Sequence, residues 1–188
     1  MKIDSDGWCD EAYIRISPHF NERPQNEKIS LIVIHNISLP RGKFGTGYVD
    51  ALFQNTLDCE ADPSFSDLEG LHVSSHFFID RKGQLFQYVS CLDRAWHAGV
   101  SRFAGREGCN DFSIGIELEG TDDIAYTDEQ YQMLALLTDT LADTYPITDI
   151  TGHANIAPQR KTDPGASFDW IKFERLCKTG KLISYPFV

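Results

Sequence analysis

The chain has 188 residues, enough for one globular domain with a sizeable core, and its hydrophobic fraction of 41% is ordinary for a water-soluble protein. Its formal net charge of −11 argues against a nucleic-acid partner, because binding to phosphates requires a basic face. The acidic N-terminus lacks an apolar signal region and no segment reaches the ~18 apolar residues of a membrane span, so we expect a cytoplasmic protein without a membrane partner.

The first half of the chain predicts strands with one helix among them. Residues 29–35 form an apolar run that ends at His35, which is typical of a central strand buried on both faces. A turn-prone stretch at 40–45 precedes a predicted helix at 48–57. Two further strands are predicted at 72–79 and 84–89, joined by a hairpin turn at 80–83.

The second half adds two strands and two helices. Residues 112–118 alternate, with Phe112 on the apolar face and Glu117 on the polar face. Thr127 and Gln130 form a capping-box pattern, and the helix that follows should end before Pro146. A short strand at 147–151 precedes a last helix that Ser167 can cap. Strands interleaved with helices predict an α/β fold with a mixed central β-sheet flanked by helices.

No repeat, low-complexity tract or charged linker divides the chain, so we expect a single domain over residues 1–188. The cysteines are odd in number, scattered and without a Cys-x-x-Cys pair, which favours free thiols in a reducing compartment over a disulfide framework. Nothing in the sequence indicates an obligate oligomer, and we expect a monomer.

The segment 151–165 combines candidate metal ligands with residues that restrict the backbone. His153 and Asp163 lie in it, and prolines and a glycine hold the loop between them. His35 ends a buried strand at the edge of the sheet, although a lone histidine there is more often structural. Two histidines and one carboxylate are a known ligand set for a catalytic zinc, so this combination indicates a metal-assisted hydrolase.

Other charged residues in these segments suggest catalytic roles. Glu117 is the candidate general base, because it lies on the polar face of an otherwise apolar strand beside Gly115. Glu119 alternates onto the same face and is a rival, although it adjoins an apparent turn. Lys161 lies between the two loop ligands and could stabilise an oxyanion, or it could be a solvated loop lysine.

The remaining histidines fit metal binding less well. His72 and His76 lie in a predicted strand, where their spacing puts them about 13 Å apart on one face, too far to share a metal. Trp96, beside His97, could offer a flat apolar surface to a sugar or peptide, or it could be a core residue. A basic patch for an anionic substrate, with solvated surface charge as the alternative, could use Arg94, Arg102, Arg106, Arg160 and Lys161.

Four motifs in the same order resemble the AmpD-type N-acetylmuramoyl-L-alanine amidases, within the wider superfamily of zinc amidases and peptidoglycan-recognition proteins. The motifs are VIHNISLP (33–40), RAWHAGVS (94–101), NDFSIGIELEGT (110–121) and TGHANIAPQRKTDPG (151–165). The resemblance extends over nearly the whole chain, and four long motifs in order are highly specific.

The resemblance implies one zinc ion bound by His35, His153 and Asp163, with Glu117 as general base and Lys161 stabilising the transition state. It also implies the substrate, cytoplasmic muropeptides with 1,6-anhydro-N-acetylmuramic acid, cleaved between the lactyl group and L-alanine during cell-wall recycling. We expect substrate contacts from Asn36, His72, Ala95, Trp96, His97, Arg102 and Arg106.

The chain departs from the family pattern at two positions. The family commonly has arginines where this chain has His72 and Gly108, which weakens the expected grip on an anionic stem peptide unless Arg102 or Arg106 substitutes. Two alternatives stay open: an amidase acting on intact peptidoglycan, and a non-catalytic muropeptide-binding protein.

Overall fold

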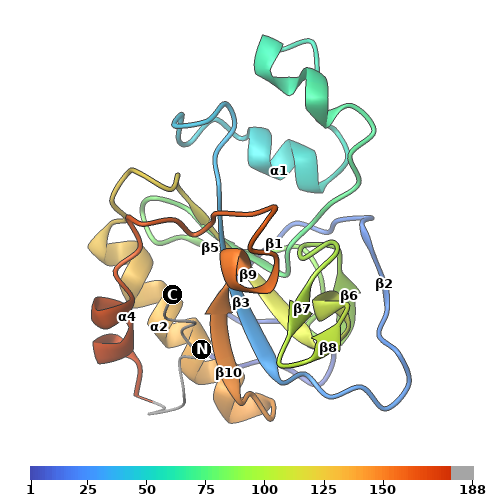
Figure 1. Cartoon of the computed structure of the whole chain (residues 1–188), viewed down its shortest axis with the longest axis vertical. Coiled ribbons are helices and arrows are strands. Elements are labelled where there is room, and N and C mark those ends of the chain that lie inside the picture. The colour runs from blue at the N-terminus through green and yellow to red at the C-terminus, as the bar shows by residue number, and fades with distance from the viewer. Residues whose placement is uncertain (179–188) are drawn as a thin grey trace.

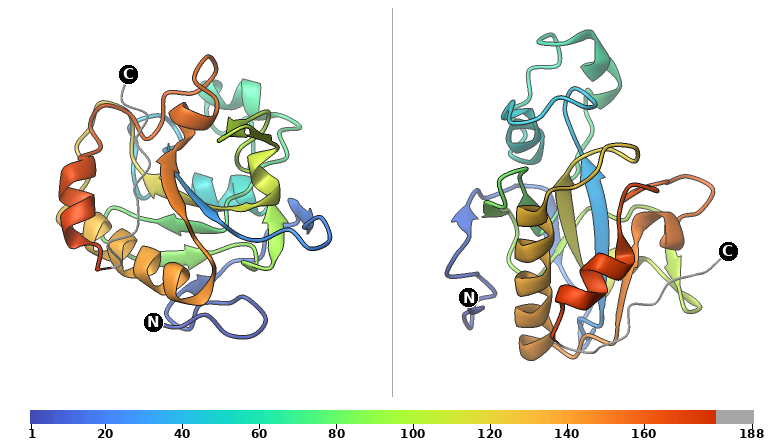
Figure 2. Two further views of the ribbon diagram at one scale, coloured as in Figure 1. Left: turned by 60° about the horizontal axis from the view of Figure 1, so that its bottom comes forward. Right: turned by 90° about the vertical axis from the view of Figure 1, so that its left-hand side faces the viewer.

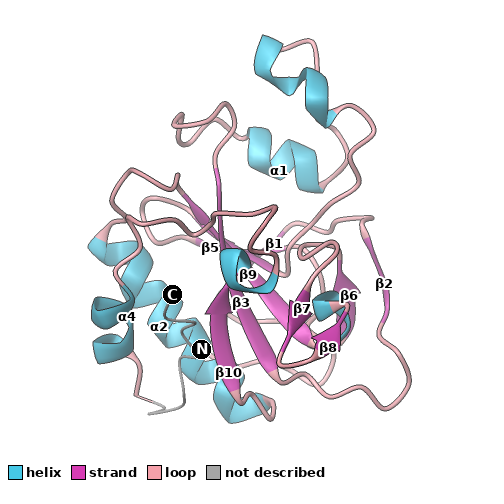
Figure 3. Ribbon diagram, viewed as in Figure 1, coloured by secondary structure: helices cyan, strands magenta, loops and turns pink. Residues whose placement is uncertain are grey.

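The structure, a computed structural model, describes residues 1–178, so residues 179–188 of the expected domain lie outside the described part. Its centre is a six-stranded sheet (Figures 1 and 3). The strands are, in sheet order, β1 (Tyr13–Ile14), β5 (Leu85–Gln87), β4 (Phe77–Ile79), β9 (Ser113–Glu119), β3 (Leu31–Ile37) and β10 (Asp149–Gly152). Two small ribbons pair β2 (Phe20–Glu22) with β6 (Asp93–Ala95) and β7 (Arg102–Phe103) with β8 (Arg106–Glu107).

Three parallel strands form the part of the sheet that matters for function. β3 pairs in parallel with β9 on one side and with β10 on the other, and β4 continues the parallel set beyond β9. The register places His35 opposite Glu117, and Gly152 opposite Ile34. The carboxyl ends of parallel strands meet at one edge of a sheet, which is where open α/β folds bind ligands. The predicted mixed sheet is confirmed.

Helices α2 (Asp128–Thr144) and α4 (Trp170–Leu176) lie side by side on one face of the sheet (Figure 2). That face presents Ile32, Ile34, Ile114, Ile116 and Leu118, all fully buried. Burial of such side chains stabilises the fold by about 1.5–3 kcal/mol each. The opposite face of β3 and β9 carries Leu31, Val33, His35, Ser113, Gly115 and Glu117.

The alternation predicted for residues 112–118 holds from Ser113 onward and fails at Phe112. Phe112 precedes β9 with a ψ of 11°, which is not extended backbone, so the two-residue period does not reach it. Its ring packs with Leu31 and Val33 on the other face. The expected shared face of Phe112 with Ile114 was therefore wrong.

Two helices begin or end differently from the prediction. The capping box of α2 is confirmed, because Thr127 accepts from the Gln130 amide and the Gln130 side chain accepts from the Thr127 amide. Helix α1 (Tyr48–Phe53) stops before residue 57, since Asn55 has a left-handed φ of 58°. Asp169, not Ser167, caps α4 by accepting from the Lys172 amide at 2.9 Å.

The predicted strand at 72–79 is reduced to β4, and the predicted strand at 84–89 to β5, but the hairpin between them is confirmed. Residues 72–76 are irregular because Ser74 and Ser75 bond outside a ladder: the Ser74 amide donates to Trp96, and the Ser75 hydroxyl donates to Phe77. The 13 Å separation expected for His72 and His76 on a strand therefore does not apply. His76 is fully buried, whereas His72 is exposed.

The remaining helices lie at the two ends of the central strands. Helix α1 and the 3₁₀ helix η1 (Pro63–Leu68) stand beyond the end of β3 (Figure 1). The 3₁₀ helix η2 (Cys109–Asp111) leads into β9, and α3 (His153–Ile156) follows β10 directly. All cysteines are free, and within residues 1–178 no helix has the length and apolar character to cross a membrane.

Candidate functional site

His35, His153 and Asp163 meet at the carboxyl edge of the sheet. The Nδ1 atom of His35 lies 2.9 Å from Nδ1 of His153 and 3.2 Å from Oδ2 of Asp163. The Nδ1 atom of His153 lies 3.1 Å from the same carboxylate oxygen. The two histidines are almost completely buried. These three side chains form a possible metal-binding group, which the sequence pattern had predicted.

The three side chains come from β3, from the end of β10 and from the loop after α3. His35 is the fifth residue of β3, and His153 starts α3 where β10 ends at Gly152. Asp163 lies beside the start of α3 because the amide of Ala154 donates to the backbone carbonyl of Asp163 at 2.8 Å.

Two further bonds hold the loop that carries Asp163. The Tyr126 hydroxyl donates to the carbonyl of Pro164 at 2.8 Å. The Thr162 hydroxyl donates to Asp122 at 2.6 Å. Together with the Ala154 bond, these contacts fix the Asp163 carboxylate against the two histidines.

The protonation states favour a cation at this point. Burial, followed by the nearby His153, lowers the pKa of His35 to about 4, so its imidazole is neutral. Burial by itself raises the pKa of Asp163, but its close contacts with His153 and His35 outweigh burial, and the net pKa lies below the ordinary value. A neutral imidazole and an ionised carboxylate are the forms in which histidine and aspartate bind metals.

A zinc ion fits this donor set. The candidate ligand atoms of the three residues all lie within 4.8 Å of one another, and zinc in catalytic sites takes three protein ligands. His153 also has the outer partner expected of a ligand, since its Nε2 donates to the carbonyl of Ala98 at 3.2 Å. The residues present therefore match the metal that the sequence pattern indicates.

Glu117 stands next to the three side chains. Its Oε1 lies 4.0 Å from Nδ1 of His35, and its buried Oε2 has no hydrogen-bond partner among the described residues. Burial raises its pKa well above the ordinary value, the charge of Asp163 adds to the rise, and Lys161 opposes it. A carboxylate with an unused oxygen beside a metal centre can accept a proton from water.

Glu119, the rival of Glu117, has both carboxylate oxygens bound to backbone. One accepts from the amide of Gly45 at 2.5 Å and the other from the amide of Arg81 at 3.2 Å. It connects the loop before α1 to the β4–β5 hairpin. This placement supports Glu117, not Glu119, as the base.

A cavity of about 500 Å³ opens beside the metal-binding group. Its walls combine apolar side chains of α1 and η1 with polar groups of the sheet edge. Of the residues predicted to act on the substrate, the cavity is lined by Asn36, His72, Trp96, His97, Glu117 and Lys161.

The structure places three other predicted substrate contacts outside this cavity. Ala95 is fully buried in the cluster of Phe78 and Tyr88. Arg106 pairs with Glu27 at 2.7 Å and lies over the ring of Phe112, 3.6 Å from its centroid.

Arg102 and Gly108 lie together on a separate hollow over β7 and β8. Gly108 has a φ of +69°, a backbone conformation that favours glycine. Arg102 and Arg106 therefore both lie outside the cavity, and neither replaces the arginines that the family commonly has.

Sequence reasoning gave no role to two residues that brace the site. Asn110 accepts with its side-chain oxygen from the amides of His97 and Ala98, at 3.1 and 2.8 Å. Asp122 accepts from Asn36 at 2.8 Å and so orients that side chain at the cavity. Both lie in or next to the third motif, but their partners are distant in sequence, and no local pattern identifies them.

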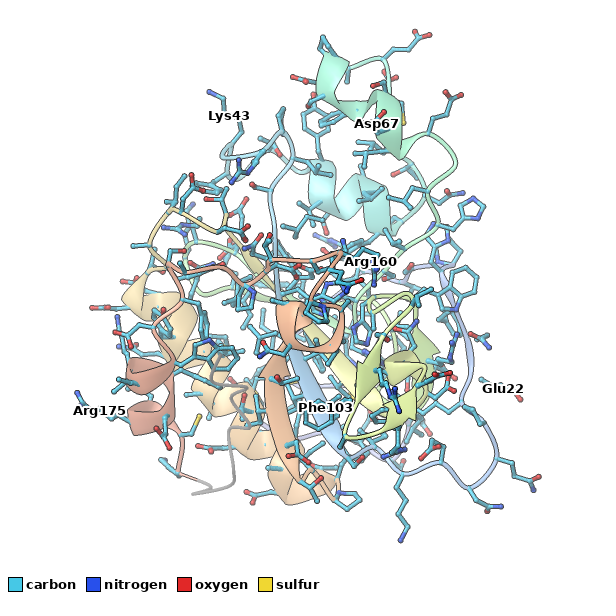
Figure 4. All side chains as sticks on the ribbon, in the orientation of Figure 1. Glu22, Lys43, Asp67, Phe103, Arg160 and Arg175 are labelled. Atoms are coloured by element: carbon cyan, nitrogen blue, oxygen red, sulfur yellow. The ribbon has the colours of Figure 1, made fainter. Side chains whose placement is uncertain are left out.

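Arg160 had been considered for a basic patch, and the structure gives its guanidinium another use. It donates to the carbonyls of Ala98 and Val100 at 2.7 and 2.8 Å. Its side chain lies beside α3 (Figure 4) and lines the same cavity as His153 and Asp163. Arg160 thereby connects the loop of Asp163 to the segment that follows Trp96.

Comparison with known proteins agrees with this site. Residues 25–166 match the family model described as N-acetylmuramoyl-L-alanine amidase. The 1,6-anhydro-N-acetylmuramyl-L-alanine amidase AmpD of Salmonella typhimurium (strain SL1344) is 59% identical over 172 residues, which cover 90% of this chain and 92% of the relative.

Solved structures show the same likeness. A crystal structure of a selenomethionine derivative of AmpD superposes with a TM-score of 0.92 at 56% identity, covering 94% of this chain and 99% of that one. The amidase AmiD from Escherichia coli, in complex with anhydro-N-acetylmuramic acid-L-Ala-D-γ-Glu-L-Lys, gives a TM-score of 0.57 at 28% identity and covers 84% of this chain and 65% of AmiD. The family match and these identities show that the chain belongs to the N-acetylmuramoyl-L-alanine amidases.

Proposed function

We propose that this amidase is zinc-dependent and cleaves the amide between N-acetylmuramic acid, in its 1,6-anhydro form, and L-alanine. The observation that carries the proposal is the convergence of His35, His153 and Asp163 with Glu117 beside them. These three side chains would hold one zinc ion per chain. Bound zinc supplies Lewis acidity, which polarises the amide carbonyl and makes water a better nucleophile at neutral pH.

The chain's own residues move the proton. Glu117 accepts a proton from the attacking water as the new carbon–oxygen bond forms. It then delivers this proton to the departing nitrogen of L-alanine as the carbon–nitrogen bond breaks. The unpaired, buried Oε2 supports this role, because nothing else in the described residues competes for it.

Lys161 stabilises the negative charge that develops on the carbonyl oxygen. Its side chain lines the cavity beside Asp163 and lies near enough to Glu117 to oppose the rise in that residue's pKa. An ammonium at this position faces the reacting carbonyl without binding the metal. Such a donor is worth about 3–4 kcal/mol where its loss has been measured in enzymes.

The substrate is a muropeptide small enough for the cavity. The printed names of the relatives support the anhydro sugar, and the AmiD complex supports a peptide attached to it. Asn36, Trp96 and His97 face the cavity and are the substrate contacts that we retain from the prediction. His72 also lines it, with its ring stacked on His19 at a centroid distance of 4.9 Å.

The resemblance to the AmpD-type amidases supports a place in cytoplasmic recycling of cell-wall fragments, carried out by a single amidase domain acting as a monomer. The net charge of −11 supports the exclusion of nucleic acid as a partner.

Product analysis by mass spectrometry tests the proposal. Zinc-loaded protein is incubated with anhydro-muramoyl tripeptide, beside the same reaction with a chelator. We expect release of free tripeptide that stops on chelation and returns when zinc is added. Protein shown to hold zinc without any cleavage would contradict the proposal and favour a muropeptide-binding protein. Cleavage of intact peptidoglycan in preference to the anhydro compound would contradict the proposed substrate and favour an amidase that acts on intact peptidoglycan.

A further inference from the structure

His35 has a second ring nitrogen that faces away from the metal-binding group. This atom, Nε2, lies 2.9 Å from Nδ1 of His97. The two rings meet edge to face, with an interplanar angle of 88°. His97 does not belong to the metal-binding group itself. It is the direct outer neighbour of one ligand.

The contact continues into the sheet. On its far side, His97 places Nε2 at 3.1 Å from the hydroxyl of Ser113, a fully buried residue at the start of β9. The Ser113 hydroxyl in turn donates to the backbone carbonyl of Cys109 at 2.5 Å. A continuous series of bonds therefore leads from the metal ligand to a carbonyl group.

The carbonyl group of Cys109 determines which atom donates in each hydrogen bond of this series. A carbonyl only accepts, so the hydroxyl hydrogen of Ser113 points at Cys109 and the hydroxyl oxygen accepts from Nε2 of His97. A neutral imidazole carries a single N–H, which leaves Nδ1 of His97 as an acceptor. His35 must then donate from Nε2. Its Nδ1 keeps a lone pair, directed at His153 and Asp163.

We propose that His97 and Ser113 are positioning residues that hold the proton of His35 on Nε2 and thereby present its Nδ1 to the metal. This inference rests on the proposed metal site and adds the series of hydrogen bonds that selects Nδ1 of His35 as the ligand atom. Outer partners of this kind typically change metal affinity by about 10–100-fold. His153 needs no such series, because the carbonyl of Ala98 fixes its proton directly.

The fold holds His97 in place by two means. Asn110 binds the backbone amides of His97 and Ala98, which fixes the segment that serves both histidine ligands. Gly115 leaves room for the ring, because a Cβ there would lie 2.5 Å from Cγ of His97. Sequence reasoning had placed His97 with the substrate; its position is compatible with that role, but its ring nitrogens already contact His35 and Ser113.

Nuclear magnetic resonance tests the proton positions in the unmodified chain. Nitrogen-15 labelled protein is examined without metal, at a pH well above the ordinary histidine pKa of about 6.5, and again after loading with zinc. We expect the ring proton of His35 on Nε2 in both samples, with a ¹⁵N–¹⁵N coupling across the hydrogen bond to Nδ1 of His97. A His35 proton on Nδ1 in the metal-free sample overturns the inference. Because that sample contains no zinc, its result is independent of the proposed function.

Zinc affinity measured by competition with a chromophoric chelator gives a second readout. His97→Leu removes the acceptor, and we expect zinc to bind about 10–100-fold more weakly. His97→Asn places a carbonyl oxygen where Nδ1 was and should recover most of that loss. Ser113→Ala should weaken zinc binding with less change in volume. Melting temperatures of the metal-free variants show that each one is folded.

His19→Leu is the matched control, because it makes the same substitution at another buried histidine that has no contact with His35. We expect its zinc affinity to equal that of the parent. Equal losses in His97→Leu and His97→Asn, or in His19→Leu, would show that packing alone matters and would overturn the inference. Failure of the parent itself to bind zinc contradicts the proposed function instead.

Discussion

Glu117 and Glu119 lie on the same strand and alternate onto the same face, yet their carboxylates meet different surroundings. Glu117 points into a buried pocket with one oxygen unpaired, whereas Glu119 binds two backbone amides. At the scale of single residues, the available hydrogen-bond partners thus separate the carboxylate that we propose as the base from a structural one. Arg160 and Lys161 both line the cavity, but the Arg160 guanidinium is already bound to two backbone carbonyls.

Replacement of Glu117 and of Glu119 tests the assignment of Glu117 as the general base. Glu117→Ala should retain zinc and lose about 10²- to 10⁴-fold in turnover, because the proton acceptor is gone while the ligands remain. Zinc content by mass spectrometry and the rate of tripeptide release measure the two quantities. Loss of zinc in this variant would identify Glu117 as a ligand and refute its assignment as base.

Glu119→Gln serves as the matched control. Glutamine keeps one carbonyl acceptor for the two amides, so we expect a loss of about 0.5–1.5 kcal/mol in the free energy of unfolding, with most of the turnover retained. If Glu119→Gln lost turnover as severely as Glu117→Ala, the roles of the two carboxylates would have to be exchanged.

At the scale of elements, the loop from α3 to Asp163 depends on one tight approach. Gly165 has a φ of +80°, and a Cβ at this position would lie 2.2 Å from Cα of Asp122. Asp122 in turn accepts from Asn36 and Thr162. The loop, the turn after β9 and the end of β3 are therefore mutually fixed.

Gly165→Ala should move the loop and Asp163 with it. We expect weaker zinc binding in the chelator competition, together with the cost of about 1–2 kcal/mol for a left-handed alanine. Gly70→Ala is the control, since Gly70 has a similar φ of +71° but no atom within 4 Å of the added Cβ. It should show the conformational cost in urea unfolding and keep the parent zinc affinity. Equal zinc affinities in the two variants would mean that the approach to Asp122 does not position the ligand.

At the scale of the whole molecule, the proposed metal would connect parts of the chain that are far apart in sequence. His35 and Asp163 are 128 positions apart, and they come from a central strand and a surface loop. A ligand that binds only the folded chain stabilises it according to its concentration and affinity. Zinc is therefore expected to act on global stability as well as on the reaction.

Unfolding by urea measures this effect. With free zinc at 100 times its dissociation constant, we expect the free energy of unfolding to rise by about 2.7 kcal/mol over the metal-free protein. The transition midpoint should fall when a chelator is added and recover with zinc. Identical midpoints with and without the chelator would show that the three side chains do not bind zinc in the folded chain.

The sequence by itself determined the elements whose signals are local. The apolar run of β3, the capping box of α2 and the β4–β5 hairpin each depend on neighbouring residues, and all three are present. The loop with His153 and Asp163 could also be recognised, because both ligands lie within one short motif. Where the local rule was ambiguous, as for residues 72–76, the predicted strand was wrong.

Only the tertiary structure decided what each side chain meets. Parallel pairing placed His35 opposite Glu117, and no pattern in either segment specifies that register. The partners of Arg106, Asn110 and Ser113 likewise come from segments that are adjacent only after folding or through turns without a sequence signal. Chain periodicity fixes which face of an element a residue occupies, whereas hydrogen-bond partners depend on packing between elements. The chemical type of the site was therefore readable from the sequence, and its geometry was not.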